Sequence, residues 1–383
     1  MHLIYLHMYG GNPSSGVNKK IIAQANNLHD TGIDFKLVLI SGINNNYPNF
    51  DFIDFQEINH TTLCKSKLMK SVIRQLHARK YIKNIVKYST NNTILYLRYP
   101  LPLFLTPFDI PKKKNCKVVL ECNSIEIEEQ KKQKIPFKYL LEILFGKSYR
   151  KNVDAIIGVT DEITHYQITR SGQLNKPSLT IGNGFAVESV PVRQIPHYTD
   201  KEFHILCVAN VSHWHGLDRL LQGLAIYSET PNVVLHIAGG GAELPTLQKM
   251  VNELGIANQV VFHGFLTGNA LNTLFDQCHI AVGSLGIHRK GLTQTSELKA
   301  REYCARGSPY VIAVSDPDFP EDFPYILHLP ADESPIDIER VVTFAKDVCA
   351  DPEHPQKMRL YAKEHLDWSV KMKRLKGFLE TLL

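Results

Sequence analysis

The sequence predicts an α/β protein built from two doubly wound domains. Two observations carry this prediction: short apolar strands alternate with helix-like segments, and the alternation restarts after a proline-containing break near residues 181–200. A chain of 383 residues with 44% hydrophobic content is large enough for two hydrophobic cores. Because ligands of open parallel sheets bind beyond the carboxyl ends of the strands, we expect a binding cleft between the domains.

The first domain begins with a strand at residues 2–9, followed by a glycine loop that opens a helix with apolar residues at helical spacing. Further strands are expected at residues 35–40, 93–97, 117–120 and 155–159 in the first domain, and at residues 204–209, 233–238, 259–263, 280–282 and 310–313 in the second. We therefore divide the chain into domains at residues 1–192 and 193–365, with a helical terminal segment at residues 366–383.

Composition excludes several classes of protein. The seven cysteines are scattered without a Cys-x-x-Cys pair, so neither a disulfide scaffold nor a zinc ribbon is favoured, and a cytoplasmic setting is expected. The N-terminus lacks the basic and apolar regions of a signal peptide, and no run reaches the roughly 18 apolar residues of a membrane span. Residues 1–190 carry 25 Lys and Arg against 15 Asp and Glu (+10), which leaves 43 − 25 = 18 against 38 − 15 = 23 (−5) for the remainder.

The excess positive charge of the first half is concentrated in a basic amphipathic stretch without acids between residues 58 and 108. Its cations are Lys65, Lys67, Lys70, Arg74, Arg79, Lys80, Lys83 and Lys87, and further lysines follow at residues 112–114, 131, 132 and 134. A solvated helix face is the ordinary alternative. We favour an anionic membrane surface as the partner, and we do not expect nucleic acid because no recognition motif is present.

The most informative motif runs from Gly291 to Pro309, where polar and charged side chains lead into a turn. Ser296 is placed to cap a helix with Glu297 in its first turn, and Gly307 ends that helix. The positive end of a helix dipole and its free N–H groups bind anions. This run therefore predicts a ligand site.

Two glycine turns each follow a predicted strand. The loop from Gly10 to Gly16 precedes a helix but lacks the Walker A sequence, so ATP hydrolysis is disfavoured. The run from Ala238 to Pro245 fails the dinucleotide fingerprint, and either a plain turn or backbone contact with a ligand explains it. His213 and His215 have no third ligand nearby in sequence, so we do not expect a metal site.

Taken together, these motifs resemble the retaining, nucleotide-sugar-dependent glycosyltransferases of family 4, which have the GT-B fold. The resemblance spans nearly the whole chain. It rests on the loop from Gly10 to Gly16, residues 154–160, Ile181 to Gly184, Trp214-His215-Gly216, Ile237 to Gly241, Val261 to Phe265 and, above all, Glu302 to Pro309. It implies two Rossmann-like domains facing across a cleft, with a C-terminal helix that crosses back to the first domain.

The resemblance also implies roles for individual residues. Family members carry two glutamates eight positions apart beside the donor, and Glu302 matches the second, which holds the ribose hydroxyls. The first is replaced by Gln294, which keeps hydrogen-bonding capacity but brings no charge; Glu297 is near enough to take its place.

The family often binds the pyrophosphate with an Arg and a Lys, where this chain has Asn210 and His215. Compensation is expected from Arg289, Lys290 or Lys299, and from the backbone N–H groups of Ser296 to Leu298.

The remaining expectations concern substrates and alternatives. The predicted donor-binding residues also include Gly16, Gly240 and Gly264, and the predicted acceptor contacts are Glu121 and Asn123. The expected reaction moves a sugar from a UDP- or GDP-linked donor to a lipid-linked or polysaccharide acceptor, with retention, without metal or cofactor, at the inner face of the cell membrane. A non-catalytic sugar-nucleotide or glycan binding protein and a GT-B-fold sugar-nucleotide epimerase stay open as alternatives.

Overall fold

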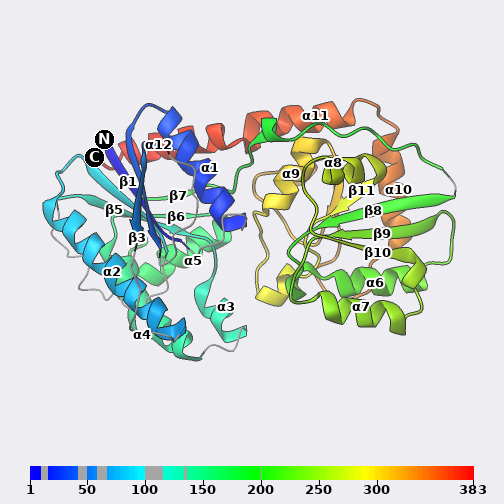
Figure 1. Cartoon of the computed structure of the whole chain (residues 1–383), viewed down its shortest axis with the longest axis horizontal. Helices are drawn as coiled ribbons and strands as arrows, with labels where there is room; N and C mark the ends of the chain where they lie inside the picture. Colours follow the sequence, from blue (N-terminus) through cyan, green and yellow to red (C-terminus); the bar gives the residue numbers. More distant parts are fainter. Residues whose placement is uncertain (10–15, 42–49, 58–66, 100–114, 133–135, 200) are drawn as a thin grey trace. The chain divides into compact units, whose positions relative to one another are not determined.

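The chain folds into two compact α/β units, as shown by the computed structural model in Figure 1. The structure describes residues 1–383 except 10–15, 42–49, 58–66, 100–114, 133–135 and 200. The predicted loop residues Gly10 to Ser15 and the lysines at positions 65, 112, 113, 114 and 134 lie outside the described residues. No helix among the described residues is long and apolar enough to cross a membrane.

The first unit contains a seven-stranded parallel sheet with the order β3-β2-β1-β4-β5-β6-β7. Its strands are β1 His2–Met8, β2 Asp34–Ser41, β3 Ile53–Glu57, β4 Thr93–Arg98, β5 Lys117–Cys122, β6 Ala155–Gly158 and β7 Ser178–Thr180. Its helices are α1 Gly16–Asp30, α2 Lys67–Tyr88, α3 Glu126–Lys132, α4 Pro136–Asn152, α5 Asp161–Ser171 and α12 Trp368–Glu380. The five strands predicted for this unit are confirmed; β3 and β7 were not predicted.

The core of the first unit follows from the alternation of side chains along its strands. Leu95 and Leu97 of β4 face the same apolar cluster as Ala78 and Ile82 of α2. That cluster also contains Tyr149 of α4 together with Ile163 and Ile168 of α5, so α2, α4 and α5 cover one face of the sheet. The C-terminal helix α12 packs against α1 in this unit, where Lys376 donates to the Thr31 carbonyl at 3.0 Å.

The second unit contains a six-stranded parallel sheet with the order β10-β9-β8-β11-β12-β13. Its strands are β8 Glu202–Val208, β9 Asn232–Ala238, β10 Val260–Gly264, β11 Ile280–Val282, β12 Tyr310–Ile312 and β13 Ile326–His328. Its α-helices are α6 Leu217–Ile226, α7 Leu244–Glu253, α8 Gly268–Gln277, α9 Leu298–Arg306, α10 Ile338–Cys349 and α11 His354–Tyr361. The five predicted strands are present, and β13 is additional. Two doubly wound α/β domains were the predicted fold class, which is confirmed.

The border between the units differs from the predicted one. The first unit comprises residues 1–182 and 368–383, whereas the second comprises residues 183–367, so the predicted start at residue 193 is too late. Residues 183–192 belong to the second unit because they are hydrogen-bonded within it. The Phe185 amide donates to Leu366 at 2.9 Å, and Asp367 accepts from the Val187 amide at 3.1 Å. Entry and exit of the chain therefore lie side by side in this unit.

A row of histidines crosses the sheet of the second unit. His204 Nδ1 lies 3.0 Å from His236 Nε2, and His236 Nδ1 lies 2.9 Å from His263 Nε2, which links β8, β9 and β10. His279 accepts the His204 amide at 3.0 Å. Burial, with the neighbouring histidines next, lowers the pKa values of His236 and His279 to about 4, so both rings are neutral at pH 7.

We expect this row to make folding stability depend on pH. The folded-state pKa values near 4 lie below the unfolded value of about 6.5, so protonation favours the unfolded state. The free energy of unfolding should then fall as pH drops from about 6.5 towards 4, by at most about 3 kcal/mol per histidine and by less because solvent screens these partly exposed rings. Urea unfolding followed by tryptophan fluorescence at pH 7, 6 and 5 measures this loss.

The variant His236→Asn should show a shallower dependence on pH, while its exposed counterpart His165→Asn, on α5, should follow the parent. If the free energy of unfolding depended on pH equally in His236→Asn and the parent, the histidine row would not contribute to the pH dependence of stability.

Candidate functional site

The best-defined polar site of the second unit lies where α9 begins, at the carboxyl ends of the strands. Tyr303 of α9 is buried, and its hydroxyl accepts the Val208 amide at 3.1 Å and donates to the Val282 carbonyl at 3.1 Å. Val208 ends β8 and Val282 ends β11, which are neighbours in the sheet. Helix α9 is thereby tied to the strand ends, where ligands of parallel sheets bind.

The segment leading into α9 is held by a polar clamp within the same unit. Ser296 Oγ accepts the amide of Asn183 at 2.7 Å, and the Asn183 side chain donates to the Ser296 carbonyl. The predicted capping role of Ser296 is therefore wrong: α9 begins at Leu298, Glu297 occupies the cap position, and the Ser296 hydroxyl is used by Asn183. Ser296 positions the loop.

Glu297 and Lys299 form a buried ion pair at the start of α9. The Glu297 and Lys299 side chains are 9% and 11% exposed, and Lys299 Nζ lies 3.7 Å from Glu297 Oε2. Among the described residues, neither Glu297 oxygen nor Lys299 Nζ has a hydrogen-bond partner. A buried charged group without hydrogen bonds costs free energy of folding, so this pair has hydrogen-bonding capacity that water or a ligand can use.

His215 adds a hydrogen-bond donor near Lys299. The ring Nδ1 accepts the Ser212 amide at 2.9 Å, so the proton of the neutral ring resides on Nε2. Burial, followed by the charges of Lys299 and Lys290, lowers the pKa of His215 to about 2. At pH 7, His215 therefore offers a neutral Nε2–H rather than a charge.

Glu302 and Gln294 occupy different surroundings. Glu302 Oε1 accepts from Arg306 Nε at 2.9 Å, and Arg306 also donates to Asn272 of α8 at 2.8 Å. Gln294 pairs with Ser315 in an isolated parallel bridge beyond the end of β12. Glu302 is thus oriented by a cation on its own helix, whereas the Gln294 backbone is fixed by the adjoining segment.

Arg289, predicted as a diphosphate ligand, is paired with carboxylates in the structure. Its guanidinium donates to both oxygens of Asp218, at 2.9 and 2.7 Å, and also to Glu333 and to the His213 carbonyl. Hydrogen bonds to these two carboxylates raise the Arg289 pKa above its usual value. Its charge is compensated, so Arg289 is a structural clamp. Lys290 lies 5.1 Å above the Trp214 ring as a cation–π pair.

The glycine turns beyond β9 and β10 pack closely against the turn beyond β8. The Gly239 amide donates to Gly264, and the Gly240 carbonyl accepts the Val211 amide, both at 2.6 Å. A Cβ on Gly241, at φ +140°, would lie 2.1 Å from the Val211 carbonyl oxygen, whereas one on Gly240 would meet nothing within 4 Å. Gly240 and Asn210 are exposed at this edge. The backbone of both residues is therefore accessible to a ligand.

The first unit has its own polar cluster at the carboxyl edge of its sheet. Glu121 at the end of β5 is 2% exposed, and Lys20 donates to it at 2.6 Å and to Asn123 at 2.7 Å. Burial opposes ionisation of Glu121, but the charges of Lys20 and Arg98 lower its pKa to about 2. Glu121 is therefore ionised and holds Lys20, a residue that the sequence analysis did not predict. Asn123 is partly exposed.

Lys20 was missed because its sequence position, within the helix that follows the glycine loop, does not reveal its buried partner. Gly16, predicted to contact the donor, is the first residue of that helix and is exposed.

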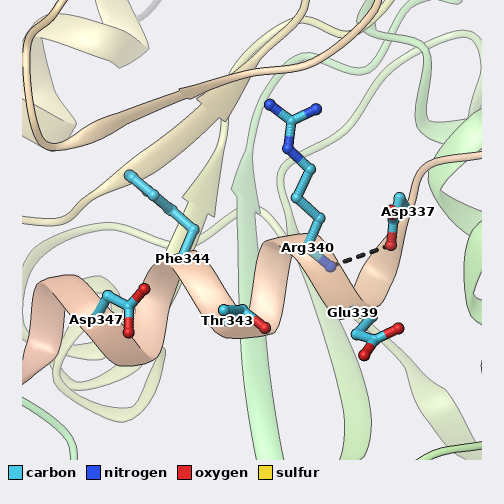
Figure 2. Close-up of a pocket in the computed structure, with 6 residues that line it drawn as sticks. All are labelled: Asp337, Glu339, Arg340, Thr343, Phe344 and Asp347. Atoms are coloured by element: carbon cyan, nitrogen blue, oxygen red, sulfur yellow. Dashed lines mark hydrogen bonds between the residues drawn. The ribbon is translucent and has the colours of Figure 1, made fainter.

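A separate pocket on the second unit lies along α10 (Figure 2) and is lined by Asp337, Glu339, Arg340, Thr343, Phe344 and Asp347. Asp337 caps this helix by accepting the Arg340 amide at 3.1 Å. The lining residues belong to α10 and its cap, and none of them belongs to the predicted site.

Comparison with known proteins identifies a matched segment in the second unit and similar structures for the whole chain. Residues 192–286 match the family model described as glycosyl transferases group 1, a span that contains Asn210, His215, Gly240 and Gly264. The whole chain superposes on a sucrose-phosphate synthase from Thermosynechococcus elongatus with a TM-score of 0.70, 16% identity, and 100% and 99% coverage of the two chains. The structural match shows that the chain shares the two-domain fold of that protein, and the family match covers part of the second unit.

Two further relatives extend the comparison. Anabaena Alr3699/HepE in complex with UDP matches with a TM-score of 0.64 and 14% identity over 100% of both chains. An uncharacterized glycosyltransferase of Methanocaldococcus jannaschii, MJ1607, is 28% identical over 126 residues, which are 33% of this chain and 31% of that protein. The matched segment thus spans about a third of the curated relative.

The two adjacent glycines allow a matched test of the turn beyond β9. We expect Gly241→Ala to lower the free energy of unfolding by on the order of 1–3 kcal/mol, because its Cβ meets the Val211 backbone at a φ that L-residues rarely adopt. Gly240→Ala should leave stability within about 0.5 kcal/mol. Thermal and urea unfolding of both variants check this, and equal losses would contradict the close packing of Gly241.

Proposed function

We propose that this chain is a glycosyltransferase that moves a sugar from a nucleoside diphosphate sugar to an acceptor hydroxyl, with retention of anomeric configuration. The observation that carries the proposal is the buried Lys299 ammonium, which has a carboxylate neighbour but, among the described residues, no hydrogen bond. It stands at the start of α9, beside the ends of β8 and β11. A cation in that position is suited to a diphosphate, whose leaving charge must be stabilised.

Three further groups complete the proposed diphosphate site. His215 contributes an uncharged Nε2–H donor, since its Nδ1 is occupied by the Ser212 amide. The start of α9 contributes backbone N–H groups and the positive end of its dipole. Lys290, near His215 and held over Trp214, contributes a second cation. Arg289 has no part in it, because its charge is already compensated.

The two glutamates of the motif receive different roles. Glu302 is turned towards Arg306 and α8 and is assigned to the ribose hydroxyls, which carboxylate oxygens accept well. Glu297 is assigned to the transferred sugar, in place of the carboxylate that Gln294 lacks. Its charge stabilises the positive charge that develops at the anomeric carbon, while Gln294 hydrogen-bonds to sugar hydroxyls. The reaction is proposed to need neither metal nor cofactor, so activity should survive EDTA.

The base of the proposed donor is uracil or guanine. Anabaena Alr3699/HepE, which has a similar fold, has structures in complex with UDP and in complex with UDP-glucose. This likeness supports a UDP-linked donor. The acceptor is proposed to be lipid-linked or a polysaccharide, at the inner face of the cell membrane, because the first half of the chain has a net charge of +10. Asn123 and the buried Lys20 and Glu121 pair are assigned to the acceptor side.

Donor binding is tested with a thermal-shift panel of UDP, GDP and ADP. One nucleotide should raise the melting temperature, because a ligand that binds only the native state stabilises it. Lys299→Met should weaken binding of that nucleotide by about tenfold or more, the loss expected for one charge-assisted hydrogen bond. Lys249→Met, which removes a lysine that is 76% exposed on α7, is the control. A Lys299 variant that binds as tightly as the control would remove Lys299 from the site.

Catalysis is tested by Glu297→Gln. We expect the turnover number to fall by about 10²-fold while nucleotide affinity stays within about threefold, because the substitution removes charge but keeps the shape of the side chain. Release of nucleoside diphosphate from UDP- and GDP-sugars in the presence of acceptor is the measurement.

Nucleotide binding without turnover of any donor would favour the non-catalytic binding protein. Epimerisation of the donor without an acceptor would favour the epimerase. If Gln294→Glu creates activity that the parent lacks, the binding protein again becomes the better description.

A further inference from the structure

Three adjacent strands of the first sheet carry polar side chains at or next to their carboxyl ends. These strands are β1, β4 and β5, and the residues are His7, Arg98 and Glu121. Arg98 stands opposite Glu121 in the register of β4 and β5. Leu97 stands opposite Leu6 in the register of β4 and β1, so His7 lies beside Arg98. The three side chains therefore form a row across the edge of the sheet.

The row points away from the apolar cluster that α2, α4 and α5 cover. The preceding residues on the three strands, Leu6, Leu97 and Leu120, belong to that cluster, and side chains alternate between the two faces of a sheet. Helix α1 lies on the opposite face, because the Tyr5 hydroxyl of β1 donates to Gln24 of α1 at 3.0 Å. The row is therefore located between the strand ends and α1.

The charges of this row and its neighbours do not balance. We name His7, Lys20, Arg98, Glu121 and Asn123 the edge cluster. Lys20 of α1 donates to Glu121 at 2.6 Å, and burial lowers the Lys20 pKa to about 8, which leaves the ammonium protonated at pH 7. Burial, followed by the charge of Arg98, lowers the pKa of His7 to about 4, so this ring is neutral. Arg98 thus gives the edge cluster a net positive charge.

The Arg98 guanidinium has hydrogen-bonding capacity that a ligand can use. Its Nη1 atom is buried and, among the described residues, has no hydrogen-bond partner. The Arg98 side chain as a whole is partly exposed, and so is Asn123, so solvent reaches this part of the edge cluster. A guanidinium presents its donors in a planar fork that matches two oxygens of a carboxylate or a phosphate.

We propose that the edge cluster is a subsite for an anionic group of the acceptor, a phosphate or a carboxylate, which the Arg98 guanidinium binds. The inference rests on the proposed function, because the bound group is part of the acceptor. Lys20 and Glu121 compensate each other and fix the strand ends, while Arg98 supplies the binding charge. An acceptor that lacks the anionic group leaves the guanidinium unpaired, so the subsite selects against neutral acceptors.

The experiment compares the binding of three sugars that differ at one carbon: glucose, glucose 6-phosphate and glucuronate. In thermal-shift titrations of the full chain at constant ionic strength, the two anionic sugars should raise the melting temperature and glucose should not. Arg98→Gln should weaken binding of the anionic sugars by about tenfold or more, the loss expected for a charge-assisted hydrogen bond. The control Arg374→Gln removes an exposed arginine of α12 and should bind as the parent does. The tighter of the two anionic sugars identifies the group as phosphate or carboxylate.

Stability without ligand separates a binding role of Arg98 from a structural one. Because its Nη1 has no partner to lose, Arg98→Gln should melt at the temperature of the parent or above it. Lys20→Met should melt at a lower temperature, since it leaves the buried Glu121 without its cation. If Arg98→Gln lowered the melting temperature as much as Lys20→Met, Arg98 would be structural and the proposal would fail.

The proposed donor site in the second unit also binds phosphate groups, so paired variants distinguish the two sites. Lys299→Met should lose nucleotide binding and keep the anionic sugars, whereas Arg98→Gln should lose the anionic sugars and keep the nucleotide. Three results would overturn the proposal: no binding of either anionic sugar, equal binding of glucose, or undiminished binding by Arg98→Gln. A parent chain that binds the anionic sugars but no nucleotide would instead count against the glycosyltransferase proposal alone.

Discussion

A buried guanidinium fixes the part of the second unit on which its polar site depends. Arg301 is fully buried and bonds to both oxygens of Asp316 and to Asp318, while its Nε donates to the Asn183 carbonyl at 2.9 Å. It also donates to the Glu297 carbonyl at 3.2 Å. One side chain therefore connects α9, the loop after β12 and the start of the unit. Removing a partner from such a buried network leaves an uncompensated charge, which typically costs about 3–5 kcal/mol.

Regular structure was predictable where burial enforces a continuous apolar pattern. Strands such as β1, β5 and β9 were found because both of their faces are covered, and they read as apolar runs. The three strands that were missed, β3, β7 and β13, all stand at sheet edges. They are short or mix polar with apolar residues, as in Ile53–Glu57. An edge strand has one neighbour and needs no such run.

The candidate site was predictable only in part, because sequence shows charge but not its compensation. Arg289 and Lys299 were equivalent candidates in the sequence analysis. The structure distinguishes them, since Arg289 meets acids 71 and 44 positions away along the chain, whereas Lys299 meets one carboxylate two positions away and makes no hydrogen bond among the described residues. Tyr303 and Arg301 were overlooked for the same reason. Their roles come from partners that only the fold brings together.

The hydrogen bonds between residues 185–187 and 366–367 have a consequence for how the protein is organised as modules. The second unit starts and ends at neighbouring points, so in topological terms it is an insertion between residues 182 and 368 of the first. Domains whose termini lie together tolerate insertion and permutation well. Replacing residues 183–367 by a related unit would therefore leave the path of the surrounding chain unchanged, so the two units can diversify separately.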